Sequence, residues 1–381
     1  MIIQSRFVYF EEALQPLQIE IEGCKIKRIL PYHLEKVDID YGDAWILPGL
    51  IDIHNHGYHG VDANHATGAW VKEWMAYLPS EGVTSTLPST SSAPHEAILK
   101  GMAEIAQAKE EGYIGTNILG IYSEGPFVAK PFNGAQNLAY QLIPTKEIID
   151  EYLKASKGLL KYVMIAPEML ESMKVIEYCT AKGLRVAIGH SGADFETCTR
   201  ARNAGAVSFT HTYNGMRGLH HREAGTVGAA MYYTDMYAEL IGDGVHVSYP
   251  SMNILARLKG KDRLISVTDS VSLKGLPVGE ITDPRSGTKF SICEDGVIRL
   301  ENGTLAGSCN RLNMILKREI EDANIDLVTA INSCTINPAR LLGYGHVKGK
   351  ILEGYDADLV VFDSSFEPIQ TYVSGQALLH R

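Results

Sequence analysis

The chain has 381 residues, 45% of them hydrophobic and 21% charged, which excludes a disordered or fibrous protein and allows one large domain with a small satellite. A formal net charge of −10 argues against nucleic acid or an acidic membrane as a partner, but it allows a small anionic substrate at a locally positive site. The six cysteines form no C-x-x-C pair, so we expect reduced thiols and no cysteine-based zinc site.

The first residues carry no secretory signal pattern, because their apolar stretch is short and is interrupted by Arg6, Glu11 and Glu12. No apolar run elsewhere approaches the length of a membrane span. We therefore expect a cytoplasmic protein.

Both ends of the chain are rich in β-type patterns. Residues 17–30 (LQIEIEGCKIKRIL) alternate apolar and polar side chains around Gly23, which is typical of two antiparallel strands joined by a turn. Residues 357–362 and 370–379 form a second such stretch. The predicted domains are a small β-sandwich subdomain formed by both termini, residues 1–47 and 346–381, and a central catalytic domain, residues 48–345.

The central part alternates short apolar runs with segments of helical spacing. Eight runs read as strands, most of them apolar on both faces, as parallel strands covered by helices are: residues 46–56, 83–89, 117–124, 161–168, 184–190, 206–211, 237–242 and 263–269. The clearest helical segments are residues 94–111, 145–155 and 168–182. This order predicts an α/β protein with a (β/α)8 TIM-like barrel. A doubly wound open sheet is the alternative, but no G-x-G-x-x-G turn supports it.

Several of these runs end in a residue able to bind a metal ion. His54 and His56 close the first run, and alternation along a strand points both imidazoles the same way. The third, fifth, sixth and eighth runs end in Glu124, His190, His211 and Asp269. In a barrel, the carboxyl ends of the strands meet at one mouth, where catalysis takes place. Imidazole and carboxylate ligands suit zinc, iron or another divalent transition metal.

Motifs along nearly the whole chain resemble the amidohydrolase superfamily, and within it the N-acetylglucosamine-6-phosphate deacetylase family. They include LPGLIDIHNHG (47–57), SEGPF (123–127), THTYNGM (210–216), LAGS (305–308) and GYDADLVVFD (354–363). The resemblance implies a metal-dependent barrel with a β-sandwich made from both termini, usually as a homodimer. It also implies that such a protein removes the acetyl group from N-acetyl-D-glucosamine 6-phosphate in amino-sugar catabolism.

The resemblance also implies how the metal ligands are shared. Glu124, His190 and His211 would hold the main ion. Because His54 and His56 are both present, the chain is similar to members with two ions, with Glu124 bridging and Asp269 nearby. We thus expect one or two divalent ions, zinc or iron, per subunit.

Further residues match substrate contacts of that family. The resemblance implies that the backbone amides of Asn214 and Gly215 receive the phosphate, and that Arg222 reaches the neighbouring subunit's site. His246 would contact the sugar and acetamide, and a loop formed by Leu305, Ala306 and Gly307 would line the sugar. Asp269 would carry the proton from water to the leaving nitrogen, with His246 assisting at the oxyanion.

The chain departs from the family pattern at Gln136, where many members have His, and within the phosphate region at Gly215 and Ala224. The Gln136 amide can still donate a hydrogen bond, although it cannot carry a proton. These departures leave the epimer open, and the corresponding N-acetyl-D-galactosamine 6-phosphate is the nearest alternative substrate.

Two more distant alternatives remain at the level of the sequence. A cyclic-amide hydrolase or an N-acyl-amino-acid deacylase often bridges its metals with a carboxylated lysine on the fourth strand, but here Lys161 begins that run instead of ending it. A non-catalytic scaffold on the same fold would lose metal ligands, whereas this chain keeps them all.

Overall fold

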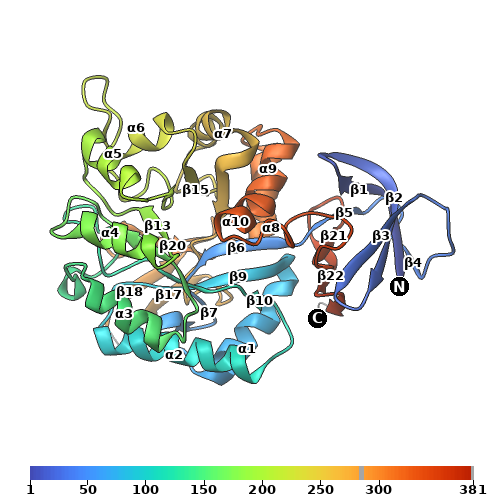
Figure 1. Ribbon diagram of the computed structural model, residues 1–381, viewed down its shortest axis with the longest axis horizontal. Coiled ribbons are helices and arrows are strands. Elements are labelled where there is room, and N and C mark those ends of the chain that lie inside the picture. Colours follow the sequence, from blue (N-terminus) through green and yellow to red (C-terminus); the bar gives the residue numbers. More distant parts are fainter. Residues whose placement is uncertain (283–286, 379–381) are drawn as a thin grey trace.

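Parallel strands arranged in a barrel form the centre of the computed structural model, which describes residues 1–282 and 287–378 (Figure 1). Apart from the first, the predicted strands are confirmed within these residues, and the third one is split in two. Their bounds are β6 (Leu50–Asn55), β9 (Val83–Thr90), β10 (Asn117–Ile118), β11 (Ile121–Ser123), β12 (Leu160–Ile165), β13 (Arg185–Ile188), β14 (Ser208–Phe209), β15 (Tyr237–Ile241) and β16 (Leu264–Val267). The barrel interior is filled by buried side chains such as Ile53, Leu87, Tyr122, Tyr162 and Ile265.

The barrel closes between the ends of the first and last strands. The backbone N–H of Asp269 donates to the carbonyl oxygen of His54 at 3.0 Å, and that of His56 donates to Ser270 at 2.7 Å. Closure therefore brings three of the predicted metal ligands to the same place.

Helices surround the barrel. They are α1 (Gly68–Tyr77), α2 (His95–Glu111), α3 (Lys146–Ala155), α4 (Ser172–Ala181), α5 (Phe195–Asn203), α6 (Gly225–Tyr232), α7 (Tyr249–Arg263), α8 (Leu312–Glu321), α9 (Leu327–Cys334) and α10 (Ile336–Leu341), with short 3-10 helices η1 (Ala63–His65), η2 (Leu78–Glu81) and η3 (Leu138–Tyr140). The three helices predicted from spacing correspond to α2, α3 and α4. Helix α2 shows why the prediction succeeds, since Ile98, Met102 and Ile105 recur on its buried face.

The two ends of the chain share one sheet at the side of the barrel (Figure 1). Its strands are β1 (Ile2–Phe10), β2 (Ala13–Glu22), β3 (Lys25–Pro31), β4 (Ile39–Asp40), β5 (Trp45–Pro48), β21 (Leu359–Phe362), β22 (Pro368–Val373) and β23 (Gln376–Leu378). The predicted hairpin is confirmed, with Gly23 at φ 59° in its turn. The exact boundaries at residues 47 and 346 stay a prediction, and Leu379 lies outside the described residues.

The single strand predicted over 46–56 is wrong. The structure divides this run into β5, which pairs with β21 in the terminal sheet, and β6, which pairs with β9 in the barrel. The change of sheet takes place at Gly49, where a Cβ atom would lie 2.3 Å from the Thr84 side chain. A side chain at this position would prevent the close approach of the two backbones.

Two further sheets were not predicted. Strands β17 (Gly279–Thr282), β18 (Lys289–Ile292), β19 (Val297–Leu300) and β20 (Leu305–Ser308) form an antiparallel meander after β16, and β7 (Gly57–Tyr58) with β8 (Val61–Asp62) forms a small hairpin. Residues 305–307, which we expected in a loop, therefore belong to a strand. Among the described residues, no helix combines the length and apolar character that crossing a membrane requires.

Candidate metal centre

Glu124, His190 and His211 lie together at the carboxyl ends of their strands. Oε1 of Glu124 is 3.0 Å from Nε2 of His190 and 2.9 Å from Nε2 of His211. The two imidazole nitrogens are 3.2 Å apart. All three side chains are buried, and their ligand atoms could grip a single ion.

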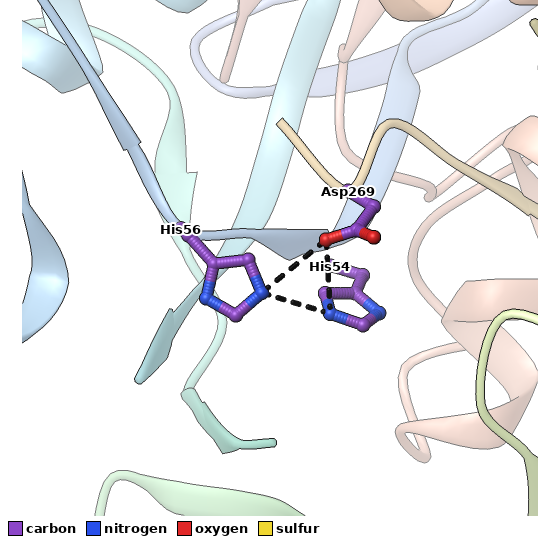
Figure 2. A group of neighbouring side chains, drawn as sticks. All are labelled: His54, His56 and Asp269. Atoms are coloured by element: carbon purple, nitrogen blue, oxygen red, sulfur yellow. Dashed lines mark hydrogen bonds and ion pairs between the residues drawn. The ribbon is translucent and has the colours of Figure 1, made fainter. Parts of the chain in front are cut away.

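His54, His56 and Asp269 form a second group, shown in Figure 2. The Nε2 atoms of the two imidazoles are 3.1 Å apart. Oδ1 of Asp269 is 3.6 Å from Nε2 of His54 and 3.4 Å from Nε2 of His56. The dashed triangle in the figure thus joins one carboxylate to two imidazoles that point toward it.

Glu124 connects the two groups. Its Oε1 is 3.6 Å from Nε2 of His54, and its Oε2 is 3.3 Å from Nε2 of His56. Oε1 therefore lies near predicted ligands of both groups and Oε2 near His56 of the second, which is the position a bridging ligand requires.

Hydrogen bonds on the far side of the imidazoles show that this geometry suits a cation. Nδ1 of His56 is 2.9 Å from the carbonyl oxygen of Ser89, and Nδ1 of His190 is 2.8 Å from that of Phe132. A carbonyl can only accept, so each Nδ1 carries a proton and each Nε2 is the nitrogen available to a bound ion. Ligands about 2.1 Å from a tetrahedral ion lie roughly 3.4 Å from one another. The separations in both groups are close to that value.

Three of the predicted ligands have left-handed backbone conformations: His190 at φ 44°, His211 at φ 28° and Asp269 at φ 45°. Such conformations are unfavourable for residues with a side chain and persist where the surrounding structure fixes them. Here they lie just beyond the strand ends, where the chain turns and the ligands project over the mouth of the barrel.

The electrostatic environment is that of opposite charges packed tightly together. Burial acts to lower the pKa of His56, but the carboxylates of Asp269 and Glu124 raise it to about 9. Although burial favours the neutral acid, the imidazoles of His190 and His211 hold the pKa of Glu124 well below its ordinary value. The carboxylates therefore favour positive charge at this point, whether on imidazoles or on a bound ion.

Gln136 lies beside the ligands. Its side-chain Nε2 donates to Oε2 of Glu124 at 2.8 Å, and its Oε1 accepts from the backbone N–H of Ser92 at 2.9 Å. The amide is thus oriented by Ser92 and directed at the bridging carboxylate.

The two residues expected to receive phosphate differ in what they offer. The backbone N–H of Asn214 donates to the carbonyl oxygen of His211 at 3.0 Å. No hydrogen bond of the Gly215 N–H is found within the described residues, and a Cβ at Gly215 would lie 2.9 Å from Nδ1 of His190. Gly215 is therefore the better placed donor of the two.

His246 is held by a neighbouring carboxylate. Its Nδ1 lies 2.6 Å from Oδ2 of Asp243, and its side chain is only 4% exposed. Oδ1 of Asp243 also accepts the backbone N–H of His246 at 2.8 Å, and Nδ2 of Asn310 donates to Oδ2 at 3.3 Å. Burial acts to lower the pKa of His246, but Asp243 outweighs it and raises that pKa.

The other predicted contacts surround the centre less closely. Strand β20 lies beside the segment that carries Asp269, because the backbone N–H of Ser308 donates to the carbonyl oxygen of Asp269 at 3.0 Å. A Cβ at Gly307 would meet that same carbonyl at 3.0 Å, and the neighbouring Ala306 is buried while Leu305 is half-buried. Arg222 lies in an exposed loop, where its guanidinium contacts the imidazole of His221 at 2.8 Å.

Two buried carboxylates near the centre were not assigned a role from the sequence. Asp243 orients His246, and Glu239 on β15 accepts from Nδ1 of His54. The signal for Glu239 is a charged residue inside the apolar run YAELI (237–241), which a fully buried strand does not otherwise tolerate.

Comparisons with known proteins agree with this centre. The sequence profile of the amidohydrolase family matches residues 45–378. An N-acetylglucosamine-6-phosphate deacetylase of Vibrio furnissii is 34% identical over 89% of this chain and 84% of its own. An N-acetylgalactosamine-6-phosphate deacetylase of Escherichia coli O157:H7 is 33% identical over 98% of both.

The fold is similar to a solved structure over its full length. The crystal structure of N-acetyl-D-glucosamine-6-phosphate deacetylase from Mycobacterium smegmatis superposes with a TM-score of 0.93 at 27% identity and covers 100% of both chains. This likeness includes the barrel and the sheet formed by both termini. The chain therefore belongs to the amidohydrolase family, a family of metal-dependent hydrolases.

Proposed function

We propose that the protein hydrolyses the acetamide of N-acetyl-D-glucosamine 6-phosphate to D-glucosamine 6-phosphate and acetate. One water is consumed, the C–N bond breaks, and the amine leaves with a proton. The observation that carries this proposal is the convergence of Glu124, His190 and His211 with His54, His56 and Asp269 in two adjoining ligand groups. Relatives named as deacetylases of amino-sugar 6-phosphates support it.

The residues of the centre divide the chemistry between them. A divalent ion bound by Glu124, His190 and His211 would supply an activated water and polarise the acetamide carbonyl. Asp269 would take the proton of the attacking water and return it to the departing nitrogen. His246, held by Asp243, presents its Nε2 side for a hydrogen bond to the acetamide or the sugar.

We further propose that the centre holds two ions, of zinc or iron. His54, His56 and Asp269 would bind the second, with Glu124 between the two. The donor set of imidazole and carboxylate groups suits either metal.

The phosphate would serve as an anchor that holds the acetamide in reactive geometry. The backbone N–H of Gly215 would receive it, with Asn214 beside it. Arg222 would reach from the neighbouring subunit of a homodimer, and its exposed position is compatible with that role. Gln136 and strand residues Leu305, Ala306 and Gly307 would line the sugar.

The relative from E. coli O157:H7 makes the galacto epimer the second candidate substrate. The test measures acetate release from both epimeric 6-phosphates and from their unphosphorylated forms, on protein of known metal content. We expect the gluco 6-phosphate to be the best substrate. Equal rates with the unphosphorylated sugars would contradict the phosphate anchor, and a faster reaction with the galacto 6-phosphate would reverse the epimer assignment.

A further inference from the structure

Glu239 is a fully buried carboxylate on the barrel strand β15, in contact with one residue of each ligand group. Its Oε2 lies 2.9 Å from Nδ1 of His54 and 3.2 Å from the backbone nitrogen of His211. One oxygen thus contacts a ligand of the second group and the backbone of a ligand of the first.

The partners of Oε2 decide which atom donates in its contact with His54. The backbone N–H of His211 can only donate, so Oε2 of Glu239 acts as an acceptor there. A carboxylate oxygen that accepts from His54 fixes the proton of that imidazole on Nδ1. The Nε2 atom of His54 faces His56 and Asp269 and is the nitrogen whose lone pair can bind an ion (Figure 2).

The charge of Glu239 has little compensation from the protein. Within the described residues, its ion-pair partner is His54, and its Oε1 has no hydrogen-bond partner. A buried carboxylate is costly unless a positive group or several donors balance it. A cation bound on the other side of the His54 ring would provide that balance, and the carboxylate would in turn make Nε2 a stronger ligand.

We propose that Glu239 is a positioning residue for the second ion, which it supports by fixing the His54 tautomer and by balancing the ion's charge. This inference rests on the proposed two-ion centre and adds to it a determinant of occupancy. The first ion depends on it less, because Glu239 contacts that group only through the backbone of His211.

The test compares Glu239→Gln with the wild type as metal-free protein titrated with Zn²⁺ against a competing chelator, with bound zinc counted by elemental analysis. We expect the wild type to bind two ions. The variant keeps the size of the side chain and removes its charge, so it should retain the first ion and bind the second about 10- to 100-fold more weakly.

Glu319→Gln is the matched control. Glu319 is equally buried, and its carboxylate contacts the hydroxyl groups of Ser266 and Ser333 instead of a metal ligand. This control should bind both ions as the wild type does. Unchanged affinity for the second ion in Glu239→Gln, loss of both ions from the folded variant, or a wild type that binds only one ion would each overturn the proposal.

A second measurement is made on the wild-type protein. In zinc-loaded wild-type protein, ¹⁵N NMR of the imidazoles should find the His54 proton on Nδ1 and the metal on Nε2, with the signal assigned by its absence from His54→Asn. The opposite arrangement would overturn the proposal. If the wild type failed to release acetate, the proposed substrate would be wrong, but the zinc titration and the NMR result would still test the role of Glu239.

Discussion

The side-chain amide of Gln136 donates a hydrogen bond to Oε2 of Glu124, the carboxylate shared by both ligand groups. Because Ser92 orients the other end of that amide, Gln136 holds Glu124 in one position without contributing charge. The resemblance described above implies a histidine at this position in many family members. The amide of Gln136 does not titrate, so its protonation state is the same at every ordinary pH.

Replacing Gln136 with Leu removes that support and leaves the Ser92 N–H without its acceptor. We expect kcat/KM for acetate release to fall about 10- to 100-fold, with weaker metal binding measured on the same sample. Gln107→Leu makes the same change on the exposed side of α2 and should leave both quantities unaltered. Full activity in Gln136→Leu would show that Glu124 does not need this contact.

Replacing Asp269 with Asn tests the proton carrier. The variant keeps the shape of the side chain but cannot accept a proton, so kcat should fall by roughly 10²- to 10⁴-fold while KM changes little. Metal analysis should find the ion of the Glu124 group retained, and Asp150→Asn on the exposed face of α3 serves as the control. A variant with wild-type kcat would assign the proton transfer to another group.

Replacing Asp243 with Asn alters His246 without touching a metal ligand. The new amide would place a donor against Nδ1 of His246 or Nδ2 of Asn310, both of which now face the carboxylate. Asp243 raises the pKa of His246, so its loss should lower that pKa and move the His246-dependent limb of the kcat/KM profile to lower pH. Asp326→Asn makes the same change at the N-cap of α9, where asparagine caps as well as aspartate, and should leave the profile unmoved. An unmoved limb in Asp243→Asn would exclude His246 from the reaction.

Stability should depend on pH through Glu319. Burial raises the pKa of this carboxyl group to about 8, against the hydrogen bonds from Ser266 and Ser333. A raised folded-state pKa means that the protonated form stabilises the fold at low pH and that this contribution is lost as pH rises through about 8. Glu319→Gln should remove the effect, so the fall in unfolding free energy between pH 6 and pH 9 should shrink by about 1–3 kcal/mol. Denaturant titrations at several pH values measure the unfolding free energy. Plots of this free energy against pH that run parallel for the wild type and Glu319→Gln would refute the prediction.

The gathering of the six predicted ligands could be anticipated from the sequence because each lies at or just beyond the end of a strand. Periodicity locates such ends, and a barrel brings its strand ends together regardless of the chain between them, as Glu124 and His211 illustrate. The break at Gly49 escaped prediction because apolar residues continue on both sides of it, and the two halves differ in their pairing partners. The pattern of one strand contains no information about its neighbours.

Residues that orient the predicted ligands were harder to predict from the sequence, for a different reason. Glu239 matters through what it contacts across space, and a hydrogen bond between distant segments leaves no spacing in the sequence. A charged residue inside an apolar strand was the available sign for Glu239, and it identifies an anomaly without naming the partner.

The hydrogen bond between the Asp269 N–H and the His54 carbonyl joins two residues that are synthesised at well-separated times during translation. A nascent polypeptide that ends before this aspartate lacks one ligand and the seam that aligns two others. An ion bound by His54, His56 and Asp269 would therefore have to await synthesis of the last barrel strand, and its presence would report that the barrel has closed.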